Sequence, residues 1–208
     1  MQVRNTVGRL SLVLTALALA APVAAQQRSL VLYAHGGGFS STQDADPAGL
    51  ADFDTGYNLG GGIGIVLSKH WAVRADFTFA RSEANDARPG GGDLLGGGLD
   101  GRDFNRFFYG GDVQFRLPIG ANLMPYAFAG GGAVTIDPAF SAGGEAGSFT
   151  KGAGKFGAGI EWDIPQTSFG LFAQGTGWLY DLDKAAFGFD ETQFDLTWSG
   201  GVSYAFRL

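Results

Sequence analysis

Apolar and polar residues alternate with a period of two along most of the chain after residue 25. The clearest run is the last, in which Phe194, Leu196 and Trp198 fall on one face and the residues between them are polar. This period indicates β-strands whose two faces meet different surroundings, and signals for helices are nearly absent. The pattern predicts eight strands, at residues 29–40, 54–67, 71–81, 104–118, 124–136, 152–164, 169–180 and 192–208.

The connections between the predicted strands alternate in length along the chain. Such alternation is typical of a barrel that spans a membrane, with short turns on the periplasmic side and long loops outside. The predicted fold is therefore all-β, an eight-stranded antiparallel up-and-down transmembrane β-barrel. The short connections are residues 68–70, 119–123 and 165–168, and the long ones are residues 41–53, 82–103, 137–151 and 181–191.

The period alone does not say which face meets lipid, because a soluble lipocalin-like barrel would hold its apolar face inside. The length of the strands favours the membrane, since about 9–11 residues cross a bilayer at a tilt. We therefore expect the apolar faces to meet lipid, whereas the strands 29–40 and 169–180 are apolar on both faces and are not oriented. In the strand 124–136 this expectation places five residues outside: Met124, Tyr126, Phe128, Val134 and Ile136.

Aromatic residues gather near the ends of the predicted strands. In transmembrane barrels such residues form girdles that anchor the protein at the two membrane interfaces. The residues expected to do so are Trp71, Tyr109, Trp162, Trp178 and Tyr180.

Charged residues of both signs fall on the polar faces, which are expected to point into the barrel. Eight strands leave an interior just wide enough for side chains or one small ligand. Opposite charges there are expected to pair and to plug the barrel, because unpaired buried charges are costly. A narrow gated pore is the alternative, since inward glycines such as Gly60 and Gly157 leave room for water. The expected network is Arg74, Asp76, Arg106, Asp112, Arg116, Lys155, Glu161, Asp163, Asp195 and Arg207.

Residues 1–25 have the pattern of a secretory signal peptide: a basic start, an apolar run and small residues before Gln26. The predicted barrel domain is then residues 26–208.

The whole chain has 14 basic and 20 acidic residues. Removing Arg4 and Arg9 with the signal peptide leaves 12 basic and 20 acidic residues, so the formal net charge falls from −6 to −8. A negative chain is a poor binder of nucleic acid. The absence of cysteine excludes disulfides, a thiolate metal site and a lipid-modified N-terminal cysteine.

The end of the chain carries a more specific pattern. The segment 199–206 has Gly201, Tyr204 and Phe206 at the spacing that small bacterial outer-membrane barrels present to their assembly machinery. With the strand pattern, the chain resembles this family, of the OmpA transmembrane-domain, OmpX and opacity-protein kind. In the family the last aromatic residue is commonly the final one, whereas Arg207 and Leu208 follow here. The resemblance implies an outer-membrane location, with lipids, lipopolysaccharide and the barrel-assembly machinery as partners.

Other motifs carry little chemistry. The segment 152–157 matches a dinucleotide-binding fingerprint, but it lies in a predicted strand instead of a strand–turn–helix unit. His35, followed by Ser40 and Asp44, is the one candidate for a catalytic base. Acidic residues of the long connections are expected to solubilise them. We expect no cofactor and no metal, and a non-enzymatic structural or surface-interaction protein whose loops contact an extracellular ligand. A narrow porin-like channel and a lipid-modifying enzyme are the alternatives.

Overall fold

The computed structural model describes residues 29–41, 51–53, 55–86, 102–138, 148–182 and 191–207. The predicted signal peptide and most of the long connections lie outside these residues. Within them no helix is long and apolar enough to cross a membrane. The described strands are β1 Ser29–Ser41, β2 Ala51–Phe53, β3 Gly56–Val66, β4 Trp71–Asp86, β5 Arg102–Arg116, β6 Leu123–Pro138, β7 Phe149–Asp163, β8 Phe169–Leu182 and β9 Glu191–Arg207.

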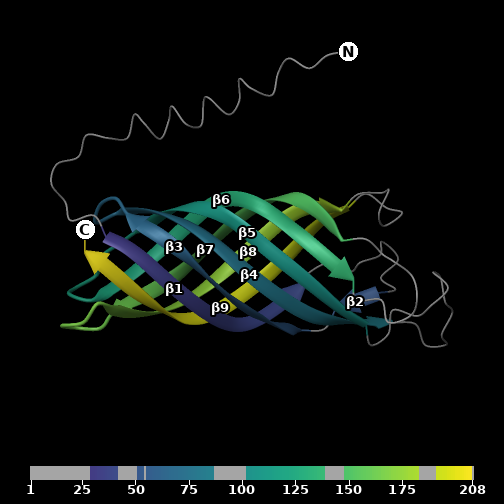
Figure 1. Cartoon of the computed structure of the whole chain (residues 1–208), viewed down its shortest axis with the longest axis horizontal. Helices are drawn as coiled ribbons and strands as arrows, with labels where there is room; N and C mark the ends of the chain where they lie inside the picture. The colour runs from purple at the N-terminus through teal and green to yellow at the C-terminus, as the bar shows by residue number, and fades with distance from the viewer. Residues whose placement is uncertain are drawn as a thin grey trace, which may run out of the picture.

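The strands form one closed antiparallel barrel (Figure 1). Each long strand pairs with its neighbours in the chain, and β1 pairs with β9 along its whole length, from Ser29 opposite Arg207 to Ser41 opposite Asp195. The short strand β2 pairs with the far end of β4, beyond the point where β3 pairs with it. Eight long strands therefore close the barrel, which confirms the predicted fold class. Closure leaves no edge unpaired along these long strands, as a strand protein in lipid requires.

The three predicted short connections are tight turns at one end of the barrel, which we call the short-turn end. Ser68 accepts hydrogen bonds from the backbone N–H groups of His70 and Trp71 in the first turn. Gly120 in the second and Gln166 in the third have positive φ angles of 67° and 64°, which allow the chain to reverse in few residues. The opposite end, where the strands lead toward the long connections, is called the loop end.

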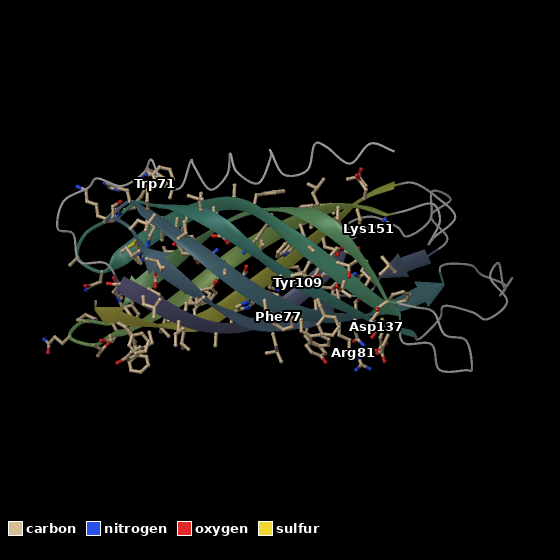
Figure 2. The ribbon with its side chains drawn as sticks, turned by 45° about the horizontal axis from the view of Figure 1, so that its top comes forward. Trp71, Phe77, Arg81, Tyr109, Asp137 and Lys151 are labelled. Carbon is tan, nitrogen blue, oxygen red and sulfur yellow. The ribbon has the colours of Figure 1, made fainter. Side chains whose placement is uncertain are left out.

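The exterior of the barrel is apolar. Seven of the eight long strands each carry a large apolar residue about half exposed on this side, a surface far larger than a soluble monomer shows. Figure 2 shows Trp71 near the short-turn end, Arg81, Asp137 and Lys151 near the loop end, and Phe77 and Tyr109 between them. The seven exposed residues are Leu32, Ile63, Phe77, Val113, Phe156, Leu171 and Val202.

Strand β6 is the exception, and the expectation for it was wrong. Tyr126, Phe128, Val134 and Ile136 are all at most 5% exposed and point into the barrel. The register gives the reason, because residues directly opposite on paired strands share a face. Phe128 lies opposite Gln114 and Val134 opposite Phe108, and these two residues of β5 point inward. After Leu123 at its start, the lipid-facing side of β6 consists of small residues, among them Ala127, Ala129, Gly131 and Ala133.

The structure also orients the two strands that the sequence left open. In β1, Tyr33 and His35 are buried inside, whereas Leu32 is exposed outside. In β8, Gln174 and Trp178 point inward, whereas Leu171 lies on the exterior. Both strands put large aromatic side chains inside the barrel, which is why their two faces look alike in the sequence.

Candidate functional site: the filled interior of the barrel

Four charged side chains meet at the middle of the barrel. The Nε and Nη2 atoms of Arg74 donate to the two carboxylate oxygens of Asp112, at 3.0 and 3.2 Å. Nζ of Lys155 lies 2.5 Å from Oδ2 of Asp112 and 2.6 Å from Oδ1 of Asp76. Arg74 also donates through Nη1 to the amide oxygen of Gln174, at 3.1 Å. Two cations and two carboxylates therefore neutralise one another in a region shielded from solvent.

A second ion pair lies toward the short-turn end. Nη2 of Arg116 donates to Oε2 of Glu161 at 2.7 Å, and the hydroxyl of Ser203 donates to Oε1 at 2.8 Å. These three side chains come from β5, β7 and β9, so the pair links strands that are not neighbours in the wall of the barrel.

A third group lies toward the loop end, around Asp195, whose side chain is completely buried. Arg106 approaches it with Nε at 3.5 Å from Oδ2, and the hydroxyls of Tyr180 and Ser41 donate to it at 2.6 and 2.8 Å. Gln193 donates to Ser41 at 2.5 Å. Each carboxylate of the three groups thus has a cationic partner, as buried charge requires.

A layer of apolar side chains closes the barrel between the middle cluster and the loop end. Its centre is the stacked pair Phe108 and Trp178, whose ring centroids lie 5.0 Å apart, with Phe39 and Val134 packed around it. The cations contact these rings directly: Nζ of Lys155 lies 5.4 Å from the Trp178 ring centroid and the Arg106 guanidinium 4.9 Å from that of Phe39. Cation–π attraction joins the charged and aromatic layers.

This layer corrects two predicted interface residues. Trp178 and Tyr180 are 1% and 3% exposed and lie inside the barrel, not at the membrane surface. Both lie an even number of residues from Gln174 on β8, so they share its face, and Gln174 points to the middle cluster. The other predicted aromatics lie outside, with Trp71 and Trp162 near the short-turn end and Tyr109 farther up the wall.

Two of the inward glycines expected to leave room for water, Gly60 and Gly157, are covered by rings. Gly60 lies beneath the imidazole of His35, and a Cβ atom built there would lie 2.6 Å from Nε2 of that ring. Gly157 lies beneath the ring of Phe128, which such an atom would also strike. Glycine is the residue that lets a ring lie flat on the adjacent strand. The expectation that these glycines hold space for a pore was therefore wrong.

The remaining predicted site residues lie at the edges of this interior. Asp163 is exposed at the end of β7, and the Arg207 side chain lies outside the described residues. Gly201 faces inward beneath the Phe172 ring, whereas Tyr204 and Phe206 lie on the exterior in edge-to-face contact, with ring centroids 4.7 Å apart.

The candidate catalytic base does not share a face with its candidate partner. His35 is buried inside the barrel, with Nε2 3.4 Å from Oγ1 of Thr78. Ser40 is an odd number of residues away on the same regular strand, so it points to the outside. Asp44 lies outside the described residues, as do half of the acidic residues of the long connections. Among the described residues, no three His, Asp or Glu side chains gather as metal ligands do.

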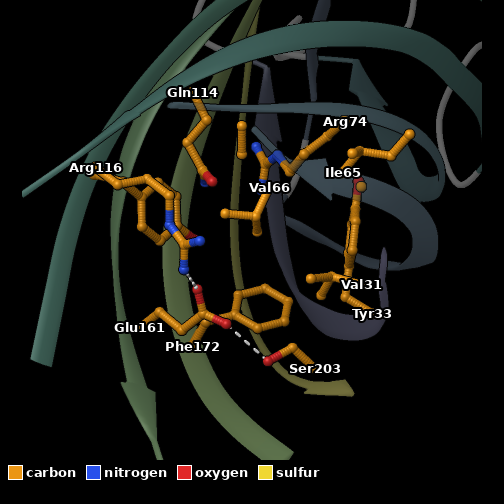
Figure 3. A pocket seen from close by; sticks show the side chains of 13 residues that line it. Val31, Tyr33, Ile65, Val66, Arg74, Gln114, Arg116, Glu161, Phe172 and Ser203 are labelled. Carbon is orange, nitrogen blue, oxygen red and sulfur yellow. Dashed lines mark hydrogen bonds and ion pairs between the residues drawn. The ribbon is translucent and has the colours of Figure 1, made fainter. Parts of the chain in front are cut away.

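A small cavity remains at the short-turn end of the interior (Figure 3). It has a volume of about 40 Å³. Arg74 of the middle cluster and Tyr126 belong to its wall, and Gln114, Arg116 and Glu161 line its polar side. No local signal in the sequence points to this cavity, because all eight long strands contribute to its wall.

A closed antiparallel barrel with an apolar exterior and a charged interior is a transmembrane β-barrel. No protein-family model and no curated protein matches the chain. The chain is, however, similar to several solved structures. Neisserial surface protein A is 12% identical, with 86% of this chain and 97% of that chain covered and a TM-score of 0.57.

A major outer membrane protein from Thermus thermophilus is also 12% identical. The match covers 87% of this chain and 100% of that chain, with a TM-score of 0.52. Ail, the attachment invasion locus protein of Yersinia pestis, is 18% identical. The match covers 88% of this chain and 100% of that chain, with a TM-score of 0.47. The likeness to neisserial surface protein A and to the Thermus protein shows that the chain has the fold of the small outer-membrane β-barrel proteins, as its sequence pattern predicted.

Proposed function

We propose that the chain is a non-conducting, non-enzymatic outer-membrane protein with a structural or surface-interaction role. The observation that carries this proposal is the filled interior. The ion pairs of the middle cluster and the Phe108–Trp178 layer occupy the section that any solute would have to cross. A barrel whose interior is packed acts through its ends and its exterior.

The exterior and the strand ends supply the surfaces for this role. The apolar outside supports an outer-membrane location with lipids and lipopolysaccharide around it, reached through the predicted signal peptide of residues 1–25. Tyr204 and Phe206 on the outer face of β9 suit recognition by the barrel-assembly machinery. The long connections at the loop end are the surface we propose for an extracellular ligand, and nothing in the negative charge of the chain favours nucleic acid.

A narrow channel is the second candidate, because Lys155 forms ion pairs with both Asp76 and Asp112. It could release one carboxylate and remain paired with the other. Conduction would require these pairs to exchange and the aromatic layer to move as well. The enzyme alternative has less support, since His35 and Ser40 lie on opposite faces of β1.

The test is single-channel conductance of the refolded mature protein in a planar bilayer, with a heat-modifiable gel shift to show that the barrel has folded. The proposal predicts insertion without discrete openings. The double variant Phe108→Ala/Trp178→Ala, which removes the centre of the apolar layer, is the matched control and should leak ions. Reproducible openings of the unmodified protein would reject the proposal in favour of the channel.

A further inference from the structure

The outer wall of the barrel carries an open groove across β7, β8 and β9. Its volume is about 520 Å³, which is within the range of about 300–1,000 Å³ typical of ligand-binding pockets. Paired small residues form its floor: Ala158 lies opposite Gly175, and Ala173 lies opposite Gly200. None of these four residues carries more than a methyl group, so the floor is nearly bare backbone.

Rows of large side chains border this groove on both sides. On the loop-end side, the stacked rings of Phe156 and Phe194 have centroids 5.9 Å apart and cover Gly177 between them. On the short-turn side, Leu171 and Val202 lie opposite each other and are 43% and 50% exposed. The floor between these ridges holds two exterior positions on each strand, about 7 Å apart. The groove is therefore narrow along the strands and longer across them.

The glycines of the floor are not required by the packing of the protein itself. Among the described residues, a Cβ atom built on Gly175 would have no heavy atom within 4 Å, and one on Gly200 would meet only a backbone oxygen at 3.8 Å. Trp198, directly opposite Gly175, lays its indole over Gly38 of β1 instead. Glycine weakens a strand, and inside one it often marks the close approach of another molecule to the backbone.

The surroundings of the groove define the chemistry of its occupant. The groove is continuous with the apolar exterior that faces lipid, and none of the described residues that line it is charged. Its polar residues Gln174 and Ser199 turn their side chains inward, where they bond to Arg74 and Asn58. Water needs polar partners to stay in such a place, and an empty groove would forfeit dispersion contacts. A hydrocarbon chain of the bilayer satisfies both conditions.

We infer that this groove binds one acyl chain of a phospholipid, which lies over Gly175 and Gly200 with the Trp198 ring beside it. The groove extends from β7 to Gly37 of β1, three strand spacings or about 14 Å. One acyl chain spans about 15 Å, half of the roughly 30 Å hydrocarbon core. The site rests on the outer-membrane location in the proposed function, but not on whether the barrel conducts.

The experiment uses the refolded protein in phosphatidylcholine nanodiscs that contain a small fraction of phosphatidylcholine with a diazirine in its acyl chain. After illumination, mass spectrometry of proteolytic peptides locates the labels. Labelling at residues 158–160, 173–175 and 198–200 should be about fivefold denser than on the rest of the apolar wall. This ratio corresponds to about 1 kcal/mol, the cost of leaving a methyl-sized void unfilled.

The variant Gly175→Leu fills the groove with a side chain of the protein. It should abolish the enrichment at residues 158–160 and 198–200, because the chain is displaced. Gly154→Leu is the matched control, since Gly154 is a bare exterior glycine of β7 outside the groove, with only the Leu179 backbone oxygen near its Cβ position, at 3.8 Å. It should leave the enrichment unchanged. The heat-modifiable gel shift shows that both variants have folded.

Two results would overturn the inference and leave the membrane location intact. One is labelling spread evenly over the exterior, which would mean that only exchanging bulk lipid meets the groove. The other is a disulfide between two copies of Gly200→Cys, whose cysteine is the only one in the chain, because a second barrel would then cover the groove. A wall without any label would instead refute the membrane location, on which the proposed function also rests.

Discussion

Asp112 is the residue whose neutralisation tests the interior network most sharply. Its side chain is fully buried and holds two cations, Arg74 through both oxygens and Lys155 through one. In Asp112→Asn the side chain keeps its shape and one acceptor oxygen, but the charge disappears. Asp76 then faces two cations, so that one buried positive charge is left without a counter-ion.

The expected cost follows from this imbalance. Removing one partner of a buried ion pair typically costs about 3–5 kcal/mol, because the remaining charge cannot be solvated. We expect Asp112→Asn to lose about 3 kcal/mol of unfolding free energy, at the lower end because the amide oxygen still accepts a hydrogen bond. The additional substitution Lys155→Met returns the cluster to one cation and one carboxylate. It should therefore recover part of the loss instead of adding to it.

The same two strands supply a matched control. Arg81 of β4 binds both oxygens of Asp103 of β5, as Arg74 binds Asp112, but this pair is on the exterior and its side chains are 41% and 29% exposed. Asp103→Asn should leave the unfolding midpoint almost unchanged, because exposed pairs contribute little. The assay is urea unfolding in lipid vesicles, followed by tryptophan fluorescence and the heat-modifiable gel shift. Equal losses for Asp112→Asn and Asp103→Asn would refute the reasoning.

Further variants test other parts of the interior. Gly159→Ala should cost about 1–3 kcal/mol by overpacking, since its Cβ would lie 2.6 Å from Tyr126 and from the backbone oxygen of Ala173. Gly175→Ala, with nothing within 4 Å of the new atom, should be neutral or slightly stabilising in the same urea assay. Trp178→Ala should cost about 3–5 kcal/mol, and a loss below about 1 kcal/mol would argue against its burial. Mass spectrometry of the exported protein should find Gln26 at its N-terminus; retention of residues 1–25 would contradict the signal-peptide assignment.

The strand pattern could be predicted because a period of two depends only on local sequence. Tight turns such as 68–70 mark the strand ends, and charged residues such as Asp112 and Arg116 fix the orientation of β5. For β6 these signals fail, since neither of its faces is charged along most of its length. Its orientation follows from Phe128 lying opposite Gln114, and this register is a property of the closed barrel.

The composition of the interior was harder to predict for a physical reason. A narrow closed barrel needs side-chain volume inside as well as charge balance, and large rings such as Trp178 fill that volume. Rings fit where glycines lie beside them on the neighbouring strands, as Gly157 does beside Phe128. These glycines and rings are far apart in the chain, so their pairing appears only when the strands are in register.

The most direct test of the account is the environment of Trp178 and Trp198. Two single-tryptophan variants, with the other three tryptophans replaced by phenylalanine, would be refolded into vesicles of lipids with brominated acyl chains. Trp198 is 44% exposed on the exterior near the middle of β9, so its fluorescence should be strongly quenched. Trp178 is 1% exposed inside the barrel and should be quenched far less. Equal quenching, or stronger quenching of Trp178, would contradict an apolar exterior in lipid around a filled interior.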